Sequence, residues 1–187
     1  MLAKLIYSAK LRYKLALPLT SGFDSRVLLA ASRKYIDDIY VYTLMYRDMT
    51  FETPDVKIPS SMLGKYKIEH NLLECRKEMD PEFMKIYRGS YYMAHDDWAS
   101  ILNGMLNQFP QDRVNVKGNC SEITRCFYYK YGTHDEIVSP RQLAALVYGW
   151  GSIQFIVDTL EGWLNSAKTI CNDYKIDILD LFYWEHR

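Results

Sequence analysis

The sequence lacks any excess of charge of one sign, because 23 Lys and Arg residues balance 23 Asp and Glu residues among 187 positions. The composition therefore gives no electrostatic support to binding of nucleic acid or of an anionic membrane surface. The sequence also lacks a hydrophobic run as long as a membrane span, and Lys4 and Lys10 interrupt the N-terminal segment where a signal peptide would need apolar residues. We expect a cytoplasmic chain that has neither nucleic acid nor a membrane as its partner.

Cysteine and histidine are scarce and scattered. The four cysteines, Cys75, Cys120, Cys126 and Cys171, form no C-x-x-C pair, which favours free thiols in a reducing compartment. The four histidines show no spacing typical of a zinc site. With 49% hydrophobic residues the chain can build a substantial core, and we expect a single domain over residues 1–187.

The most informative stretch is Leu15–Ala31, where the character of the sequence changes twice. An apolar run ends at Leu19, polar residues 20–25 follow, and apolar residues then recur at helical spacing from Val27. This order predicts a strand, a tight turn and a helix. Pro18 is compatible with this prediction at a bulge or at the end of the strand.

A turn of this kind directs backbone N–H groups and small hydroxyl groups at one point beside the positive end of a helix. Gly22 allows a ligand to approach the backbone closely, and Asp24 is suited to hold a cation that accompanies a polyphosphate. The sequence thus predicts an anion site. The alternative is an ordinary strand-to-helix turn in which Ser21 or Asp24 caps the helix.

The turn resembles the S-G-G-x-D-S loop of the PP-loop ATP pyrophosphatases, a superfamily that includes asparagine synthetase. Thr20 replaces the first Ser of that motif, and Ser21 replaces the first Gly, so that position 21 loses the freedom that Gly has at positive φ. The resemblance implies that Asp24 binds Mg²⁺. It also implies that ATP is bound by Thr20, Ser21, Gly22, Phe23, Asp24 and Ser25.

Residues 39–44 are rich in β-branched and aromatic residues and predict a second strand. In the resembling family the C-terminal end of this strand contacts the adenine, mostly through backbone groups. The resemblance therefore implies that Thr43 and Leu44 bind the nucleotide. A plain core strand is an equally good interpretation of the same residues.

The segment after this strand resembles the asparagine synthetase domain a second time. Residues 55–70 carry D-V-K, then L-G, then E-H at the spacing found there. Thr53 and Pro54 predict the start of a helix, and Gly64 predicts its end. Pro59 is expected to kink or shorten this helix.

Residues 113–117 predict a short fourth strand, and a turn from Gly118 to Glu122 leads into a helix predicted over residues 123–131. This turn lies where asparagine synthetases carry a second motif, S-G-E-G-A-D-E-L-F. By that resemblance Gly118 is a candidate nucleotide-binding residue, and Glu122 is a candidate metal-binding and catalytic carboxylate beside Asp24. The alternative is that Glu122 is an acid in the first turn of a helix and interacts only with the helix dipole.

Together these elements predict an α/β fold with a doubly wound parallel sheet, covered by helices on both faces. The strands are expected at residues 15–19, 39–44, 67–73 and 113–117. A helical C-terminal part is expected at residues 141–148, 153–171 and beyond residue 177. Right-handed crossovers bring the turns after the first and fourth strands to one crevice. We expect no glutaminase domain before the loop, and the helical pattern that is still open at Arg187 predicts that the domain continues.

The resemblance implies cleavage of ATP into AMP and pyrophosphate. A carboxylate or carbonyl oxygen of an unknown small-molecule acceptor would attack the α-phosphorus, and an amine would then displace AMP. ATP and Mg²⁺ are the expected cofactors, with Arg26 and Lys117 as additional positive charges or as solvent-facing side chains. The alternative is a catalytically degenerate nucleotide-binding or scaffold domain. Under either interpretation, the expected protein partners of this chain are further copies of it or the remainder of a longer protein.

Overall fold

The structure is a computed structural model that describes residues 1–90, 95–118, 127–128, 139–147 and 149–186. The chain divides into two compact units, residues 1–118 and residues 119–187. The first unit contains the sheet, and the second is helical in its described part.

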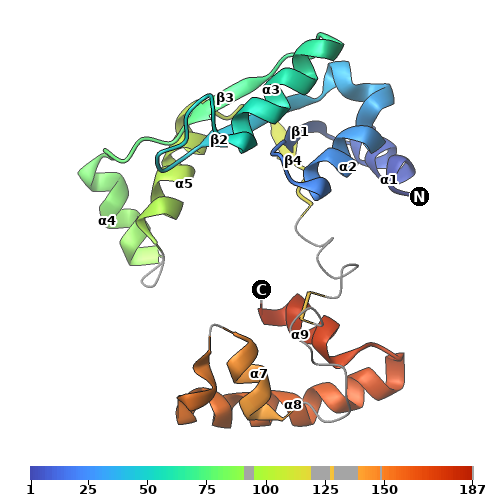
Figure 1. Ribbon diagram of the computed structural model, residues 1–187, viewed down its shortest axis with the longest axis vertical. Coiled ribbons are helices and arrows are strands. Elements are labelled where there is room, and N and C mark those ends of the chain that lie inside the picture. Colours follow the sequence, from blue (N-terminus) through green and yellow to red (C-terminus); the bar gives the residue numbers. More distant parts are fainter. Residues whose placement is uncertain (91–94, 119–126, 129–138, 148, 187) are drawn as a thin grey trace. The chain divides into compact units, whose positions relative to one another are not determined.

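The first unit is built on a four-stranded parallel sheet with the order β3-β2-β1-β4 (Figure 1). Its strands are β1 (Lys14–Pro18), β2 (Tyr40–Met45), β3 (Asn71–Glu74) and β4 (Arg113–Asn115). The chain moves outward from β1 through β2 to β3 and then returns to the other side of β1. The direction of winding therefore reverses between β1 and β4, and the carboxyl ends of these two strands flank the switch point.

The burial pattern of the central strand β1 explains why its residues form a strand. Leu15 and Leu17 are almost completely buried in one core, whereas Ala16 between them is buried in a second core with Tyr42. Such alternation is the period-2 pattern of a strand covered on both faces. Pro18 is the last residue of β1, so the predicted strand end is confirmed.

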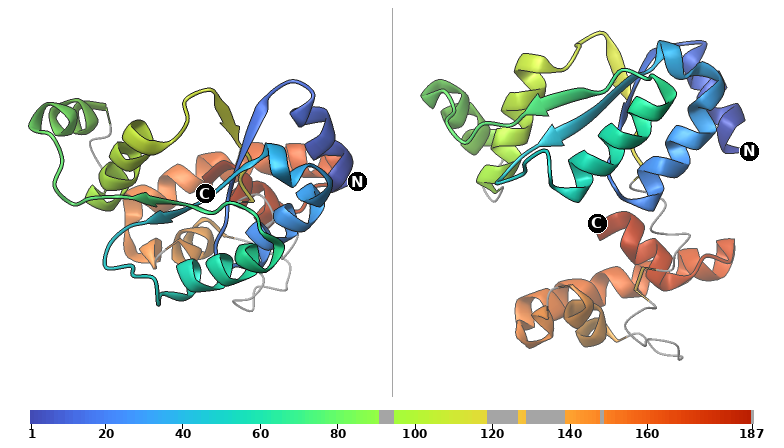
Figure 2. Two further views of the ribbon diagram at one scale, coloured as in Figure 1. Left: turned by 90° about the horizontal axis from the view of Figure 1, so that it is seen from above. Right: turned by 45° about the horizontal axis from the view of Figure 1, so that its top comes forward.

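Helices flank the sheet, and α4 and α5 lie at the opposite end of the unit from α1 and α2 (Figure 2). The helical segments of this unit are α1 (Leu2–Lys10), α2 (Phe23–Ser32), η1 (Arg33–Asp38), α3 (Pro54–Tyr66), α4 (Pro81–Ser90) and α5 (Asp96–Gln108). Buried Ile6, Leu28 and Leu63, from α1, α2 and α3, join the core that contains Leu15 and Leu17. The prediction of an α/β fold with a four-stranded parallel sheet is confirmed.

The C-terminal boundary predicted for α3 is wrong. Gly64 does not end the helix, which continues to Tyr66. Lys67 ends it instead by adopting a left-handed conformation with φ of 55°, and its N–H group bonds back to the carbonyl groups of Leu63 and Gly64. Pro59 lies inside α3 and does not shorten the helix.

The second unit is formed by α7 (Pro140–Leu146), η3 (Trp150–Ser152), α8 (Gln154–Tyr174) and α9 (Ile178–His186). The helix predicted over residues 153–171 is confirmed as α8, which buries Val157, Leu160, Leu164 and Ala167. The helix predicted over residues 123–131 lies almost entirely outside the described residues.

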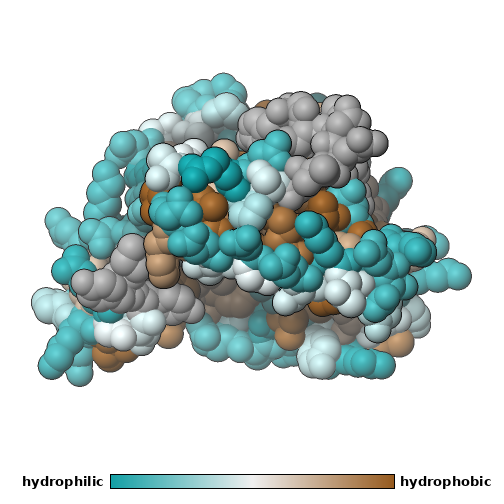
Figure 3. All heavy atoms as spheres, turned by 90° about the horizontal axis from the view of Figure 1, so that it is seen from below, coloured by the Kyte–Doolittle hydropathy of each residue, from teal (hydrophilic) through white to brown (hydrophobic). Residues whose placement is uncertain are grey.

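The surface carries scattered apolar side chains. On the face shown in Figure 3, hydrophobic residues lie between hydrophilic ones rather than in one continuous patch. Among the residues that the structure describes, no helix is both long enough and apolar enough to cross a membrane.

Candidate functional site

The loop after β1 folds back over the first turn of α2. The N–H group of Gly22 donates to Oγ1 of Thr20 at 3.1 Å, and the N–H group of Thr20 donates to Oγ of Ser25 at 3.1 Å. The Ser25 hydroxyl also lies 3.2 Å from the carbonyl oxygen of Gly22. The hydroxyl groups of Thr20 and Ser25 therefore fix the shape of the loop through hydrogen bonds to its own backbone.

The replacement of Gly by Ser at position 21 causes no backbone strain. Among the described residues, the only non-glycine residues with positive φ are Arg47, Lys67 and Lys175. Gly22 itself is extended, with φ of −66° and ψ of 151°. Glycine is favoured at position 22 because the backbone lies close to Thr20. A Cβ added there would be 3.2 Å from the Thr20 hydroxyl oxygen, and the hydroxyl would have to shift slightly.

Gly22 is the N-cap residue of α2 and has no side chain that could accept the N–H groups of the first turn, so no side-chain cap of this helix is found among the described residues. The alternative interpretation, in which Ser21 or Asp24 caps this helix, is therefore wrong. Asp24 lies in the first turn, half-buried, and Phe23 before it is 72% exposed.

A positive charge lies across this helix end. Nε of Arg26 donates to the carbonyl oxygen of Gly22 at 3.3 Å, and the guanidinium group lies 4.7 Å from the centre of the Phe23 ring. Both contacts are local to the loop and the first turn. They hold the guanidinium group against the first turn of α2, where its charge adds to the positive potential of the helix end.

The turn after β4 lies directly against Asp24. A Cβ added to Gly118 would be 3.1 Å from Cβ of Asp24 and 3.4 Å from Cδ1 of Leu28. Only a glycine fits here without displacing its neighbours. The predicted meeting of the first and fourth turns is thus confirmed for Gly118, whereas Glu122 lies outside the described residues.

A carboxylate from α3 binds the loop, and sequence reasoning missed it. The N–H group of Ser21 donates to Oδ1 of Asp55 at 3.0 Å, and the Ser21 hydroxyl donates to the same oxygen. In the sequence Asp55 stands only as the first residue of the D-V-K segment, next to the predicted helix start. Its position in the first turn of the helix that follows the second strand is the available signal.

The side chain of Thr43, in the second half of β2, is buried and hydrogen-bonded inside the protein. Its hydroxyl is buried and donates to the carbonyl oxygen of Leu19 at 2.6 Å, and it lies 2.8 Å from Nε2 of His70. Nδ1 of His70 lies 3.0 Å from the Ser60 hydroxyl. Burial lowers the pKa of His70. Thr43 can therefore face a ligand only through its backbone, as can Leu44, whose apolar side chain is half-buried.

The donor set near the loop fits a magnesium ion that is held mainly by phosphate oxygens and water. Mg²⁺ in nucleotide sites takes one or two protein carboxylates and completes its shell with substrate and solvent. Asp24, in the first turn of α2, is the carboxylate that the resemblance leads us to expect here. Within the described residues no group of three or more His, Cys, Asp or Glu side chains could hold a metal ion without substrate.

The described cysteines give no sign of nucleophilic chemistry. Cys75 and Cys171 are both free thiols. Burial raises the pKa of Cys75 to about 11, which keeps it protonated and unreactive at neutral pH. Cys120 and Cys126 lie outside the described residues.

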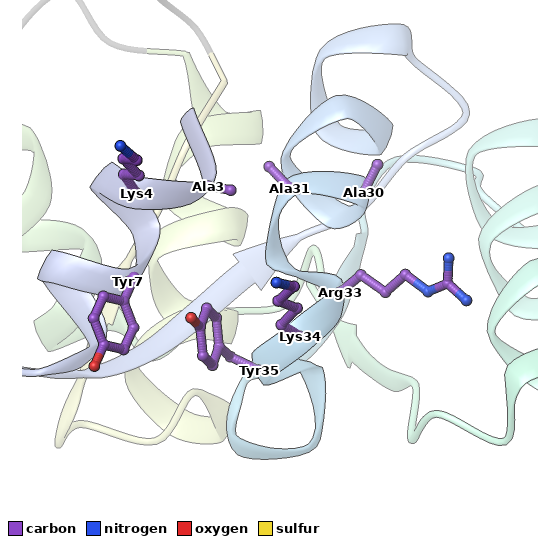
Figure 4. A pocket seen from close by; sticks show the side chains of 8 residues that line it. All are labelled: Ala3, Lys4, Tyr7, Ala30, Ala31, Arg33, Lys34 and Tyr35. Atoms are coloured by element: carbon purple, nitrogen blue, oxygen red, sulfur yellow. The ribbon is translucent and has the colours of Figure 1, made fainter. Parts of the chain in front are cut away.

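A hollow of about 340 Å³ lies between α1 and the C-terminal end of α2, away from the loop (Figure 4). Tyr7 and Tyr35 stack on each other in its lining, with ring centres 5.2 Å apart, whereas Arg33 points away from α1. The hollow lies at the opposite end of α2 from the uncapped N–H groups, so it is not part of the candidate site.

Compared with protein-family models, with curated proteins and with solved structures, the chain matches none of them.

Proposed function

We propose that this chain binds ATP and Mg²⁺ at the loop of residues 20–25 and cleaves ATP to AMP and pyrophosphate, in the manner of asparagine synthase-like ligases. One observation carries the proposal: the uncapped N-terminus of α2 begins at the carboxyl end of β1, at the switch point of a parallel sheet, and Gly118 after β4 packs against Asp24 there. Open α/β sheets bind ligands at this place. The doubly wound PP-loop form of the fold is part of the same proposal.

The proposed roles follow from the chemistry of each group. The N–H groups at the start of α2 and the guanidinium group of Arg26 would donate hydrogen bonds to phosphate oxygens, because both carry positive potential. Asp24 would hold Mg²⁺, and Glu122 is the proposed second carboxylate. The backbone of Thr43 and Leu44 would contact the adenine.

In the proposed reaction an oxygen of the acceptor's carboxylate or carbonyl group forms a bond to the α-phosphorus of ATP. The bond between that phosphorus and the bridging oxygen breaks, and the electron pair leaves with pyrophosphate. An amine then displaces AMP. The protein supplies no nucleophile in this scheme. It would align the attacking oxygen of the acceptor with the bridging oxygen that leaves, and stabilise the charge that develops on the leaving pyrophosphate.

A second candidate function is nucleotide binding without turnover. The observation in its favour is the contact between Ser21 and Asp55, which already uses one backbone N–H group of the loop. A binding module of this kind would show affinity for ATP or AMP but would release no pyrophosphate.

The test combines calorimetric titration of the purified chain with ATP, in the presence and absence of Mg²⁺, with a pyrophosphate-release assay. Asp24→Asn should keep the fold and lose magnesium-dependent binding, because the amide cannot replace the negative charge. The matched control is Asp173→Asn, an exposed acid of the second unit. Binding without pyrophosphate release with any carboxylate acceptor would favour the second candidate. No binding at millimolar ATP would refute both.

A further inference from the structure

Asp55 occupies a rigid position. Thr53 is the N-cap residue of α3, Pro54 is its first residue and Asp55 follows in the first turn. The proline ring fixes its own φ angle, and the Thr53 hydroxyl accepts the N–H group of Thr50 at 2.9 Å. The carboxylate of Asp55 is therefore carried by a well-defined helix start rather than by a loose loop.

This carboxylate holds the middle of the loop. Oδ1 of Asp55 accepts both the N–H group and the hydroxyl group of Ser21, which lies 34 residues earlier in the chain, and these contacts are partly buried. Hydrogen bonds to an ionised acceptor are stronger than those between neutral groups. A glycine at position 21 could donate only the first of the two bonds, so the Ser found here adds a contact that the motif's Gly could not make.

The residues on either side of Ser21 are fixed independently. Leu19 donates its N–H group to the carbonyl oxygen of Tyr42 at 2.8 Å and accepts the Thr43 hydroxyl at 2.6 Å. Ser25, at the far side, closes the loop onto Thr20. The two hydrogen bonds from Ser21 to Asp55 connect the middle of the loop to α3.

We propose that Asp55 is a positioning residue of the phosphate-binding loop. It holds Ser21 so that the first-turn N–H groups of α2 keep the arrangement that accepts a polyphosphate, and Ser21 and Asp55 together replace the glycine of the motif. This inference rests on the proposed function, because the ligand it serves is Mg²⁺-bound ATP. By this proposal the Ser at position 21 is matched by Asp55, so this departure from the motif is not a sign that the loop has lost its function.

The first experiment needs no ligand and uses the full chain. Amide hydrogen exchange at Ser21 should be about tenfold faster in Asp55→Ala than in the wild type, because the N–H group loses its charged acceptor. Ser21→Ala should keep this protection at residue 21, since the backbone bond to Asp55 remains. Glu52→Gln is the control for charge, because Glu52 pairs with Lys57 at an exposed position. Unchanged exchange at position 21 in Asp55→Ala would overturn the proposal.

The second experiment measures the affinity for ATP with Mg²⁺. Asp55→Ala should weaken binding about tenfold, and Asp55→Asn should restore most of the loss, because its amide oxygen still accepts the two bonds. The double variant Ser21→Ala with Asp55→Ala should bind no more weakly than Asp55→Ala alone. Unchanged exchange protection in β2 serves as the check that each variant is folded.

The outcomes separate this proposal from the proposed function. A wild-type chain that does not bind ATP refutes the function, and the exchange experiment then still decides whether Asp55 fixes the loop. Faster exchange in Asp55→Ala with unchanged ATP affinity would refute the positioning role. Tighter binding in Asp55→Ala would also refute it, because Asp55 would then compete with the phosphate for the N–H group of Ser21.

Discussion

Gly118 and Asp24 lie so close together that a Cβ added to the glycine would be 3.1 Å from Cβ of the aspartate. Gly118 follows β4, and Asp24 lies in the first turn of α2, which follows β1. The two residues are far apart in the chain, but β1 and β4 are adjacent strands of the sheet. The contact ties the first turn of α2 to the neighbouring strand. A side chain at position 118 would require Asp24 or Leu28 to shift.

Gly118→Ala should lower the free energy of unfolding by about 1–3 kcal/mol, because the added methyl group must displace the backbone of Asp24 or the side chain of Leu28. Gly64→Ala is the matched control. Nothing lies within 4 Å of a Cβ added to Gly64 in α3, so the better helix propensity of Ala should raise stability by roughly 0.5–1 kcal/mol. Urea unfolding of the three proteins measures both effects. Equal stability of Gly118→Ala and the wild type would show that this contact can relax.

Thr43→Val should lower the free energy of unfolding by about 1–3 kcal/mol, because the carbonyl oxygen of Leu19 and Nε2 of His70 would lose their buried partner. Thr43→Ser keeps the hydroxyl and should recover most of the loss. Affinity for ATP should change little in Thr43→Ser, because the proposed contact to adenine uses the backbone. Loss of ATP binding in Thr43→Ser, with stability retained, would contradict that assignment.

The stability of the first unit should depend on the charge of His70. Burial lowers the pKa of His70 from its usual value of 6.5, so the folded chain binds this proton less tightly than the unfolded chain. The free energy of unfolding should therefore be largest above that value and fall as the pH drops through the lowered pKa. Urea unfolding across this range, compared between the wild type and His70→Gln, measures the effect.

In His70→Gln this part of the pH dependence should disappear, because the amide can bond to the two hydroxyl groups but cannot titrate. His95→Gln serves as the control histidine and should keep the slope of the wild type. A His70→Gln protein whose stability still falls in the same way would place the titrating group elsewhere.

Arg26→Gln should weaken the binding of ATP with Mg²⁺ about fivefold, equivalent to roughly 1 kcal/mol, because the loop loses the positive charge held over Phe23 and Gly22. The difference should shrink at high salt, where the interaction between the exposed charges is screened. Titration at low and high ionic strength measures it. Lys85→Gln on α4 removes an equal charge at an exposed position away from the loop and should leave the affinity unchanged.

Much of the local structure follows from short stretches of sequence. The apolar run before Thr20 and the helical spacing after it were enough to predict β1, the turn and α2. The sequence of residues 153–171 was likewise enough to predict the long helix α8. The boundary of α3 was not predictable in this way, because a left-handed Lys67, which has no strong local preference for that conformation, ends the helix.

The sequence alone determined the order of the elements and the place of the candidate loop at the end of a central strand, because these depend on periodicity and on turn residues within a few positions. Only the tertiary structure decided which distant side chains meet there. Asp55 reaches Ser21, His70 joins Thr43 to Ser60, and Gly118 packs on Asp24 only once the sheet order and the placement of α3 are fixed. Such contacts depend on how elements pack in space, and no local pattern in the chain encodes them.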